Sequence, residues 1–138
     1  MKKAFLDTNI FVRYIIGDTE NSGIDIVELF QQGAEGEIEF VTKTEALIEL
    51  NYVLKTHYNL DREKVIMAIS TILNLGSVSV VDSEAITLEK ILKLYANYSQ
   101  LSLEDCVYLQ HCLQEKIDLI TLDKKLKNVF EKLKSTVQ

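Results

Sequence analysis

The chain has 138 residues, 47% of them hydrophobic and 26% charged, a balance that is typical of a globular protein and excludes extensive disorder. Its net charge of −6 has the wrong sign for holding nucleic acid by bulk electrostatics. The charge is uneven, because residues 116–138 carry six lysines and three acidic side chains whereas residues 1–115 carry nine basic and 18 acidic ones. This basic end permits a polyanionic partner, and a solvated lysine-rich helix is the alternative.

The cysteine content and the lack of a long apolar run predict a soluble, cytoplasmic protein that does not enter a membrane. Cys106 and Cys112 form no Cys-x-x-Cys pair, and with only two histidines in the chain a zinc site is not expected. Few cysteines fit a reducing compartment. Asp7, Asn9 and Arg13 interrupt the apolar run that a signal peptide would need, and no uncharged run has the character of a membrane span.

Four short apolar runs rich in β-forming residues predict strands over residues 4–6, 38–41, 78–81 and 119–122. The segments between and after them predict helices over residues 9–16, 22–34, 43–58, 61–74, 84–98, 103–116 and 124–133. Asp61 and Ser102 stand where N-caps are expected. Short apolar strands that alternate with helices indicate a parallel sheet covered on both faces. Because the chain has no linker, low-complexity stretch or internal repeat, we expect residues 1–138 to form a single α/β domain.

Acidic side chains follow three of the four predicted strands. Asp7, Asp82 and Asp123 each stand directly after an apolar run, and Thr42 follows the remaining one. Ligands of parallel sheets collect outside the carboxyl ends of the strands, so acids there are candidates for a site. An aspartate in this place is also a preferred N-cap of the next helix, and capping alone would explain any one of them.

Two acids lie on the predicted helix over residues 43–58. Glu49 lies towards the apolar face that Ala46 and Val53 share, where a carboxylate is unexpected. Glu45 lies one turn earlier, and two like charges four residues apart destabilise a helix by about 0.2–0.5 kcal/mol unless a cation lies beside them. A pair of side chains reaching out from the edge of the buried stripe is the alternative, and helical geometry does not choose between Glu45 and Glu49.

On the predicted helix over residues 103–116, two adjacent acids point in different directions. Glu104 shares its face with Tyr108, on what we expect to be an exposed polar strip. Asp105 shares its face with Cys112, close to the core. Ser102 and Asp105 also have the spacing of a capping box, which would explain Asp105 without any chemistry.

At the last predicted strand, Thr121 and Asp123 are two residues apart and would line one side of the strand end. With Asp7, Glu49 and Asp105, Asp123 completes a candidate set of four carboxylates. Four carboxylates in one cleft cannot all stay ionised unless cations neutralise them, and oxygen ligands without His or Cys suit Mg²⁺ or Mn²⁺. Such acid clusters serve two-metal phosphoryl transfer, in which one ion helps to activate a water and the other stabilises the leaving oxygen.

Four stretches of the chain resemble the PIN-domain family and, within it, the VapC-like toxin ribonucleases of type II toxin–antitoxin systems. They are FLDTNIFVRYIIGD, ALIELNYVL, SLEDCVYLQHCLQ and DLITLDKKL, and their order and spacing match the family across most of the chain. The resemblance implies a three-layer α/β/α sandwich with a central parallel sheet of four to five strands. It also implies that the catalytic acids and metal ligands are Asp7, Glu49, Asp105 and Asp123, supported by Asn9 and Thr121.

The function that this resemblance implies is metal-dependent cleavage of single-stranded RNA by an endoribonuclease that uses Mg²⁺ or Mn²⁺ and leaves a 5′-phosphate and a 3′-hydroxyl. The partners that it implies are the RNA substrate, a cognate antitoxin protein and a second copy of the chain in a homodimer. Such domains usually close with a fifth short strand after the last acid. The final stretch, KNVFEKLKSTVQ, shows no strand pattern, so this chain departs from the family there.

Two other functions are alternatives. A PIN scaffold could serve partner or RNA binding without cleavage, although all four acids are present. A phospho-accepting domain of receiver type would use Asp82 as the phosphorylated residue. The receiver alternative lacks an acidic neighbour beside Asp7 and the lysine of a fifth strand, and it leaves Glu49 and Asp105 unexplained.

Overall fold

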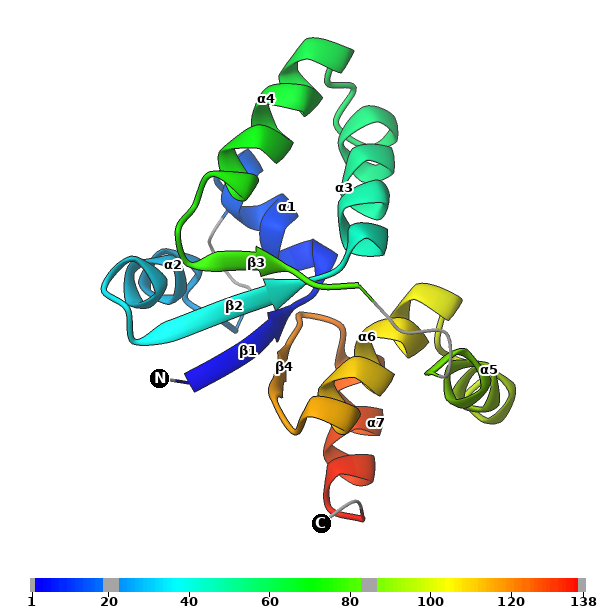
Figure 1. Ribbon diagram of the computed structural model, residues 1–138. Coiled ribbons are helices and arrows are strands. Elements are labelled where there is room, and N and C mark those ends of the chain that lie inside the picture. The colour runs from blue at the N-terminus through cyan, green and yellow to red at the C-terminus, as the bar shows by residue number, and fades with distance from the viewer. Residues whose placement is uncertain (1, 19–22, 83–86, 137–138) are drawn as a thin grey trace.

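The structure is a computed structural model that describes residues 2–18, 23–82 and 87–136. Its centre is a four-stranded sheet of order β3-β2-β1-β4, in which every pair of neighbouring strands is parallel (Figure 1). The strands are β1 (Lys2–Leu6), β2 (Ile38–Thr42), β3 (Val78–Val80) and β4 (Asp118–Ile120). Phe5 of β1 lies opposite Val41 of β2 and Leu119 of β4, so the three strands end near one edge of the sheet.

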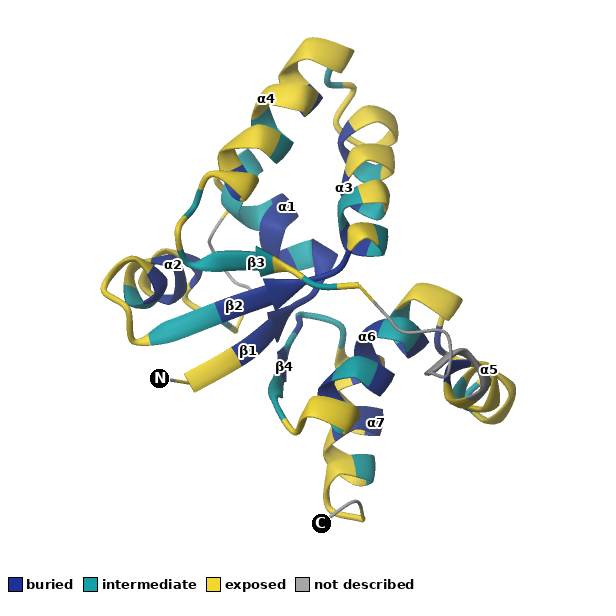
Figure 2. Cartoon of the chain, in the orientation of Figure 1, coloured by how far each residue is buried: buried dark blue, intermediate teal, exposed yellow. Residues whose placement is uncertain are grey.

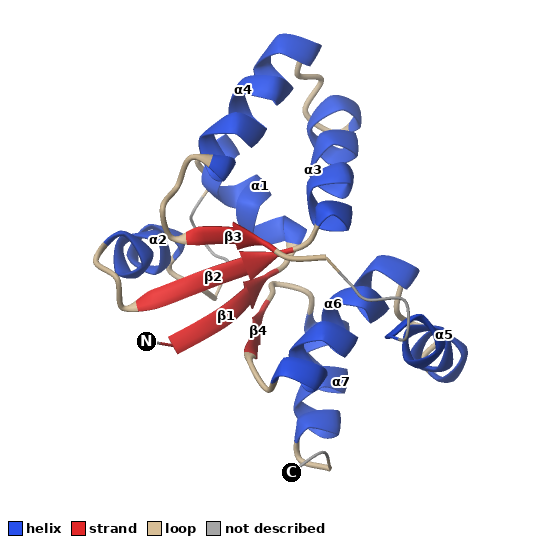
Figure 3. Cartoon of the chain, viewed as in Figure 1, coloured by secondary structure: helices blue, strands red, loops and turns tan. Residues whose placement is uncertain are grey.

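The described residues form seven helices in two layers, one on each face of the sheet (Figure 3). The first layer holds α1 (Thr8–Ile16), α2 (Ile26–Ala34), α3 (Thr44–Thr56) and α4 (Arg62–Leu73). The second holds α5 (Thr87–Asn97), α6 (Leu103–Glu115) and α7 (Lys124–Lys134). Alternating side chains of β1 divide the core, because Ala4 and Leu6 pack in the first layer and Phe5 packs in the second. The fold is therefore the predicted three-layer α/β/α sandwich.

Polar caps explain where most of these helices begin. The side chains of Asp25, Asp61 and Ser102 accept backbone N–H groups in the first turns of α2, α4 and α6, which confirms the predicted caps at Asp61 and Ser102. Asp7 and Asp123 cap α1 and α7 in the same way. The predicted helix starts at residues 22 and 84 lie outside the described residues. Residues 23–25 are described and are not helical, because Asp25 is the N-cap and α2 begins at Ile26.

The carboxyl halves of the two central strands are the most enclosed part of the sheet (Figure 2). In β1 the burial pattern changes from exposed at Lys2 and Lys3 to buried from Ala4 to Leu6. Side chains that follow these strand ends are consequently held by a packed core on both faces. None of the helices in the described part of the chain is long and apolar enough to cross a membrane.

The last strand is shorter than predicted and ends at Ile120 instead of residue 122. The chain turns there because the backbone N–H of Leu122 donates to Oδ1 of Asn9 at 3.2 Å and not to a neighbouring strand. The prediction that Thr121 and Asp123 extend from one side of a strand is therefore wrong, since both lie in the turn before α7. From Lys124 to Lys134 the chain is helical, and the described residues contain no fifth strand.

Candidate active site

Asp7 leaves the carboxyl end of β1 and is buried, with 4% of its surface exposed. Its backbone N–H donates to the carbonyl oxygen of Ile120 at 3.1 Å, so the turn after β1 is tied to the end of β4. Its side chain caps α1, because Oδ1 accepts a 2.7 Å hydrogen bond from the backbone N–H of Thr8. Asp7 is thus an N-cap, which was one of the two explanations for an acid at this position. Its second oxygen, Oδ2, makes separate contacts.

Asn9 and Thr121 join Oδ2 of Asp7 to the turn between β4 and α7. The Thr121 hydroxyl donates to this oxygen at 2.6 Å, and the Asn9 amide donates to it at 3.3 Å. The same amide donates to Thr121 Oγ1 at 3.3 Å, and that oxygen also accepts the backbone N–H of Asp123 at 3.0 Å. The two residues expected to support the site therefore both contact its first acid.

Asp123 directly precedes α7 as its N-cap, and Asp105 stands in the first turn of α6. Oδ1 of Asp123 accepts the backbone N–H groups of Lys125 and Leu126 at 2.9 and 3.3 Å. Oδ2 of Asp105 accepts the backbone N–H of Ser102 at 3.1 Å, and Ser102 Oγ accepts the N–H of Asp105 at 3.1 Å, which is the predicted capping box. One oxygen of each carboxylate is thus held by its own helix.

Glu49 comes from the middle of α3, and two hydroxyl groups bind one of its oxygens. The Thr8 hydroxyl lies 3.0 Å from Oε2, and the Tyr108 hydroxyl lies 3.1 Å from the same atom. Thr8 begins α1, and Tyr108 lies one turn after Asp105 on α6. Glu49 is therefore linked to both of the helices that carry Asp7 and Asp105 at their starts.

The four carboxylates line one cavity of about 330 Å³ at the carboxyl edge of the sheet. The other residues that line it are Thr8, Asn9, Val12, Arg13, Val53, Tyr58 and Ser102. Cations could reach the carboxylates here, because Asp105, Asp123 and Glu49 are only partly buried. The cavity thus gathers acids from the turn after β1, from α3, from α6 and from the turn before α7.

The other acids that the sequence left open do not line this cavity. Glu104 is exposed on α6. Glu45 lies near Lys43, and its negative charge raises the pKa of Lys43, although burial lowers that pKa more strongly. Asp82 follows β3 and accepts a 2.9 Å hydrogen bond from the Thr44 hydroxyl. The cavity therefore includes Glu49 but not Glu45, and Asp105 but not Glu104. Asp82 does not line it with Asp7, as a receiver-type site would require.

Burial raises the pKa of Asp7 from 3.8 to about 7. The hydrogen bond from Thr121 opposes this rise, and the negative charges of Asp105 and Glu49 add to it. A carboxylate that is desolvated and surrounded by like charges is stabilised when a cation arrives. Asp7 is therefore a carboxylate whose charged form a nearby cation would stabilise.

The same causes act on Glu49 and Asp105. Burial raises the pKa of Glu49 against the hydrogen bonds from Thr8 and Tyr108, and the charge of Asp105 raises it further. Burial also raises the pKa of Asp105 against the hydrogen bonds of its capping box, and the charge of Asp123 adds to this. These mutual effects show that the four carboxylates form one electrostatic cluster.

The donor set fits a hydrated Mg²⁺ or Mn²⁺ ion. Oxygen-only donors suit these hard cations, and zinc would prefer His or Cys. As they stand in the described part of the chain, no three His, Cys, Asp or Glu side chains are arranged to hold an ion directly. Mg²⁺ usually keeps several waters and takes only one or two carboxylates, so these side chains could hold a hydrated ion without forming a closed protein cage.

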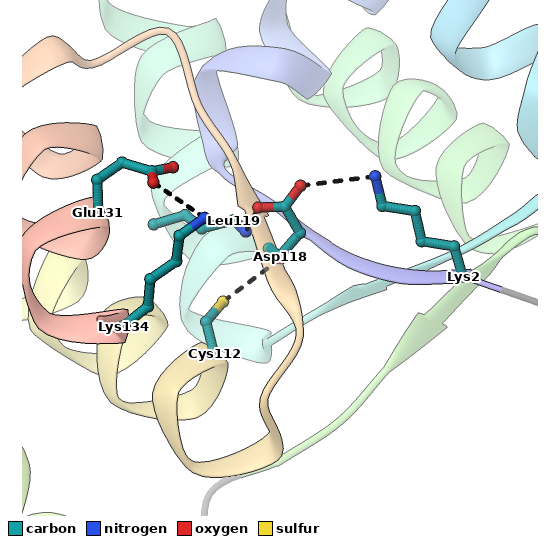
Figure 4. A network of polar contacts seen from close by, with 6 residues as sticks. All are labelled: Lys2, Cys112, Asp118, Leu119, Glu131 and Lys134. Atoms are coloured by element: carbon teal, nitrogen blue, oxygen red, sulfur yellow. Dashed lines mark hydrogen bonds and ion pairs between the residues drawn. The ribbon is translucent and has the colours of Figure 1, made fainter. Parts of the chain in front are cut away.

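A different cavity, of about 580 Å³, lies at the opposite end of the sheet, where β1 and β4 begin. Three charged side chains in its lining form ion pairs, with Lys2 Nζ 3.7 Å from Asp118 Oδ2 and Lys134 Nζ 2.9 Å from Glu131 Oε2 (Figure 4), and Lys116 lines it as well. The Cys112 thiol donates to the carbonyl oxygen of Asp118 at 3.8 Å. With one acid in its lining, this cavity is not a candidate for a cation site.

Sequence reasoning missed two residues of the site, Thr8 and Tyr108. Thr8 had no predicted role, and the prediction that Tyr108 lies on an exposed strip is wrong, since its side chain is fully buried. The buried arc of α6 is wider than one face because the sheet, α5 and α7 all pack against it. The signal that could have found Tyr108 is its spacing, one helical turn after Asp105.

Comparison with known proteins agrees with this architecture. The family model of the PIN domain matches residues 4–132, and no curated protein matches the chain in sequence. One similar solved structure is that of VapBC2 from Rickettsia felis bound to a DNA fragment from their promoter, with a TM-score of 0.68 and 20% identity over 92% of each chain. Another is Mycobacterium tuberculosis VapC20, a Sarcin-Ricin loop cleaving toxin, with a TM-score of 0.71 and 15% identity over 91% of this chain and 94% of that one. These likenesses concern the fold, and the family match spans nearly the whole sequence, so the chain belongs to the PIN domain family.

Proposed function

We propose that this protein is a metal-dependent endoribonuclease that cleaves single-stranded RNA and acts as the toxin of a toxin–antitoxin pair. The observation that carries the proposal is the cavity lined by Asp7, Glu49, Asp105 and Asp123, with Asp7 buried and its pKa raised to about 7. Membership of the PIN domain family supports it, as does the similarity in fold to a toxin that cleaves the Sarcin-Ricin loop.

The ends of three helices make the cavity suitable for a phosphodiester. Asp7, Ser102 and Asp123 are the N-caps of α1, α6 and α7, and all three line the cavity. Helix N-termini carry partial positive charge and favour phosphate groups. They would also lessen the repulsion between the acids and an incoming RNA backbone.

The chain's own groups would hold the cation and keep it in place. Asp7, Glu49, Asp105 and Asp123 would bind it, directly or through water. The bound Mg²⁺ or Mn²⁺ would supply the Lewis-acid chemistry that activates a water and stabilises the leaving oxygen. Thr121 and Asn9 would keep the Asp7 carboxylate oriented, because their hydrogen bonds restrict Oδ2 as outer groups around metal ligands do.

The basic helix α7 would bind the RNA backbone beside the acids. Its buried side chains include Leu126, Val129 and Phe130, and its lysines at 124, 125, 127, 132 and 134 are exposed. The first of them follows Asp123 directly. RNA held at the cavity could therefore continue along α7, which would allow a protein with a net charge of −6 to bind it.

The test is cleavage of an unstructured RNA oligonucleotide by the purified protein with Mg²⁺ or Mn²⁺, with EDTA and with a duplex of the same sequence as controls. We expect Asp7→Asn to lower the rate by at least about 100-fold, more than the loss of an outer-shell group. Asp61→Asn is the matched control, because Asp61 is also an N-cap but lies on α4, away from the cavity. Full activity of Asp7→Asn, or cleavage that persists in EDTA, would contradict the proposal, and binding of RNA without cleavage would favour a scaffold function.

We also propose a cognate antitoxin and a second copy of the chain as partners. The antitoxin partner is supported by the similarity in fold to the structure of VapBC2 bound to a DNA fragment from their promoter. The test is co-expression with the protein encoded by the neighbouring reading frame, followed by co-purification and the cleavage assay. We expect this protein to copurify and to suppress cleavage, and sedimentation of the chain alone would establish whether it forms a dimer.

A further inference from the structure

The carboxylate of Glu49 is held by one of its two oxygens. Oε2 lies 3.0 Å from the Thr8 hydroxyl and 3.1 Å from the Tyr108 hydroxyl, and each is placed to donate to it. Neither of these two hydroxyls contacts Oε1. Among the four acids of the cavity, Glu49 is the one whose side chain is oriented by hydroxyl groups from two other helices.

Tyr108 connects the separate elements that carry the acids. Its hydroxyl reaches Glu49 on α3 and lies 3.4 Å from Thr8 Oγ1 on α1. Its own backbone lies one turn after Asp105 on α6, and its ring lies 4.9 Å from the ring of Phe5, centroid to centroid, on β1. A movement of any one of these elements would therefore change the position of the Glu49 carboxylate.

The hydroxyl of Tyr108 has little freedom to move away. The side chain is 0% exposed, and the tilted contact with Phe5 fixes the plane of the ring. Thr8 is 3% exposed, and Oγ1 is also within 3.3 Å of the carbonyl oxygen of Ala46. Each hydroxyl carries one proton, so Tyr108 and Thr8 together supply at most two hydrogen bonds to the carbonyl oxygen of Ala46 and to Glu49 Oε2. Glu49 Oε2 is the acceptor that both hydroxyls share.

We propose that Tyr108 and Thr8 are positioning residues of the metal centre, which hold Glu49 by Oε2 and leave Oε1 as the oxygen offered to the cation. This inference rests on the proposed function. Hydrogen bonds from neutral donors to an ionised carboxylate are strong and favour its charged form. Removing them would let the Glu49 side chain rotate and would weaken the site for a divalent cation, without removing any ligand.

The experiment compares Mn²⁺ binding in the full-length wild-type protein and in four variants by isothermal titration calorimetry and by electron paramagnetic resonance of the free ion. Tyr108→Phe keeps the ring and removes the hydroxyl, and Thr8→Val removes the second donor. Thr8→Ser keeps that donor and is the conservative rescue. Tyr14→Phe is the matched control, because it removes a phenol hydroxyl from a ring that stacks on Phe30 at 4.0 Å in the other layer.

We expect the Mn²⁺ dissociation constant to rise by about 10–100-fold in Tyr108→Phe and in Thr8→Val, as for other outer-shell groups. Thr8→Ser and Tyr14→Phe should bind Mn²⁺ like the wild type. In RNA cleavage at limiting Mn²⁺, the two weakened variants should lose kcat and keep KM for RNA. Thermal unfolding in EDTA shows which variants fold. If Tyr108→Phe does not fold, the comparison of Thr8→Val with Thr8→Ser tests the inference.

Equal Mn²⁺ affinity in the wild type, Tyr108→Phe and Thr8→Val would overturn the inference and leave the proposed function standing. A wild-type protein that binds no Mn²⁺ would overturn both. Weaker Mn²⁺ binding in the two variants, combined with a wild type that cleaves no RNA, would support the positioning role and contradict the proposed ribonuclease activity.

Discussion

The Thr121 hydroxyl donates a 2.6 Å hydrogen bond to Oδ2 of Asp7, across a separation of 114 positions in the chain. Both side chains are 4% exposed. The bond joins the turn after β1 to the turn after β4, two strands that are neighbours in the sheet. The orientation of the first acid of the site is thus set by the far end of the sequence.

Replacing Thr121 by valine should weaken both the fold and the site. The change removes a hydrogen bond to a buried carboxylate, which costs about 1.5–3 kcal/mol in the free energy of unfolding. We expect a lower urea midpoint in EDTA and RNA cleavage that is slower by about 10–100-fold. Thr121→Ser keeps the donor and should resemble the wild type, and a Thr121→Val protein with wild-type stability and rate would refute this role.

The stability of the metal-free protein should fall as the pH rises from acid towards neutral. The pKa of Asp7 is 3.8 in an unfolded chain and is raised to about 7 in the folded one, so between these values the folded state binds more protons. Its free energy of unfolding therefore decreases across this interval, and the full cost of the buried charge is present above a pH of about 7.

Urea denaturation in EDTA measures this dependence. Asp7→Asn cannot ionise and should lose less stability than the wild type between about pH 5 and pH 8. Asp61→Asn keeps an exposed cap on α4 and should follow the wild type. Equal losses of stability in Asp7→Asn and the wild type over this range would show that folding does not raise the pKa of Asp7.

Neutralising Lys124 and Lys125 together should weaken RNA binding and spare the chemistry. These exposed lysines follow Asp123, and each contact with a single-strand phosphate contributes about 0.7 to the slope of log affinity against log salt. The double change to glutamine should lower that slope by about 1.4 and raise KM, with kcat unchanged. Changing Lys2 and Lys3 to glutamine removes equal charge at the opposite end of the sheet and should leave KM unaltered. Equal effects of the two double variants would mean that α7 holds no RNA.

Gly33→Ala should destabilise the fold where α2 packs on β2. A Cβ atom at this position would lie 2.6 Å from Cε2 of Phe40 and 3.0 Å from Oγ of Ser77. Such overpacking costs about 1–3 kcal/mol, which equals or exceeds the gain in helix propensity of about 1 kcal/mol. Gly76→Ala meets nothing within 4 Å and is the control. A urea midpoint of Gly33→Ala at or above that of the wild type would contradict the close packing.

Much of the architecture was predictable from the sequence because local signals and burial agree in it. Strands buried on both faces need runs of apolar residues. Residues 4–6 supplied a continuous run, and residues 38–41 supplied one that only Glu39 interrupts. Caps such as Asp61 and Ser102 were predictable because a side-chain oxygen before a helix has a local partner in its first turn.

The predictions that were wrong concern features that depend on tertiary contacts. The end of β4 depends on Asn9, which captures the backbone N–H of Leu122 from 113 positions away, so no local pattern reveals it. The burial of Tyr108 depends on the elements that surround α6, and a single helical face does not describe a helix covered on several sides. The choice of Glu49 over Glu45 likewise follows from how α3 meets α1 and α6, through Thr8 and Tyr108.

Manganese-soaked crystals would show whether the four carboxylates bind a cation, because an anomalous difference map locates the ion without reference to activity. We expect a manganese peak inside the cavity lined by Asp7, Glu49, Asp105 and Asp123, and the loss of that peak in Asp7→Asn crystals. A soaked wild-type crystal with no peak in this cavity, or with manganese bound only elsewhere, would contradict this expectation.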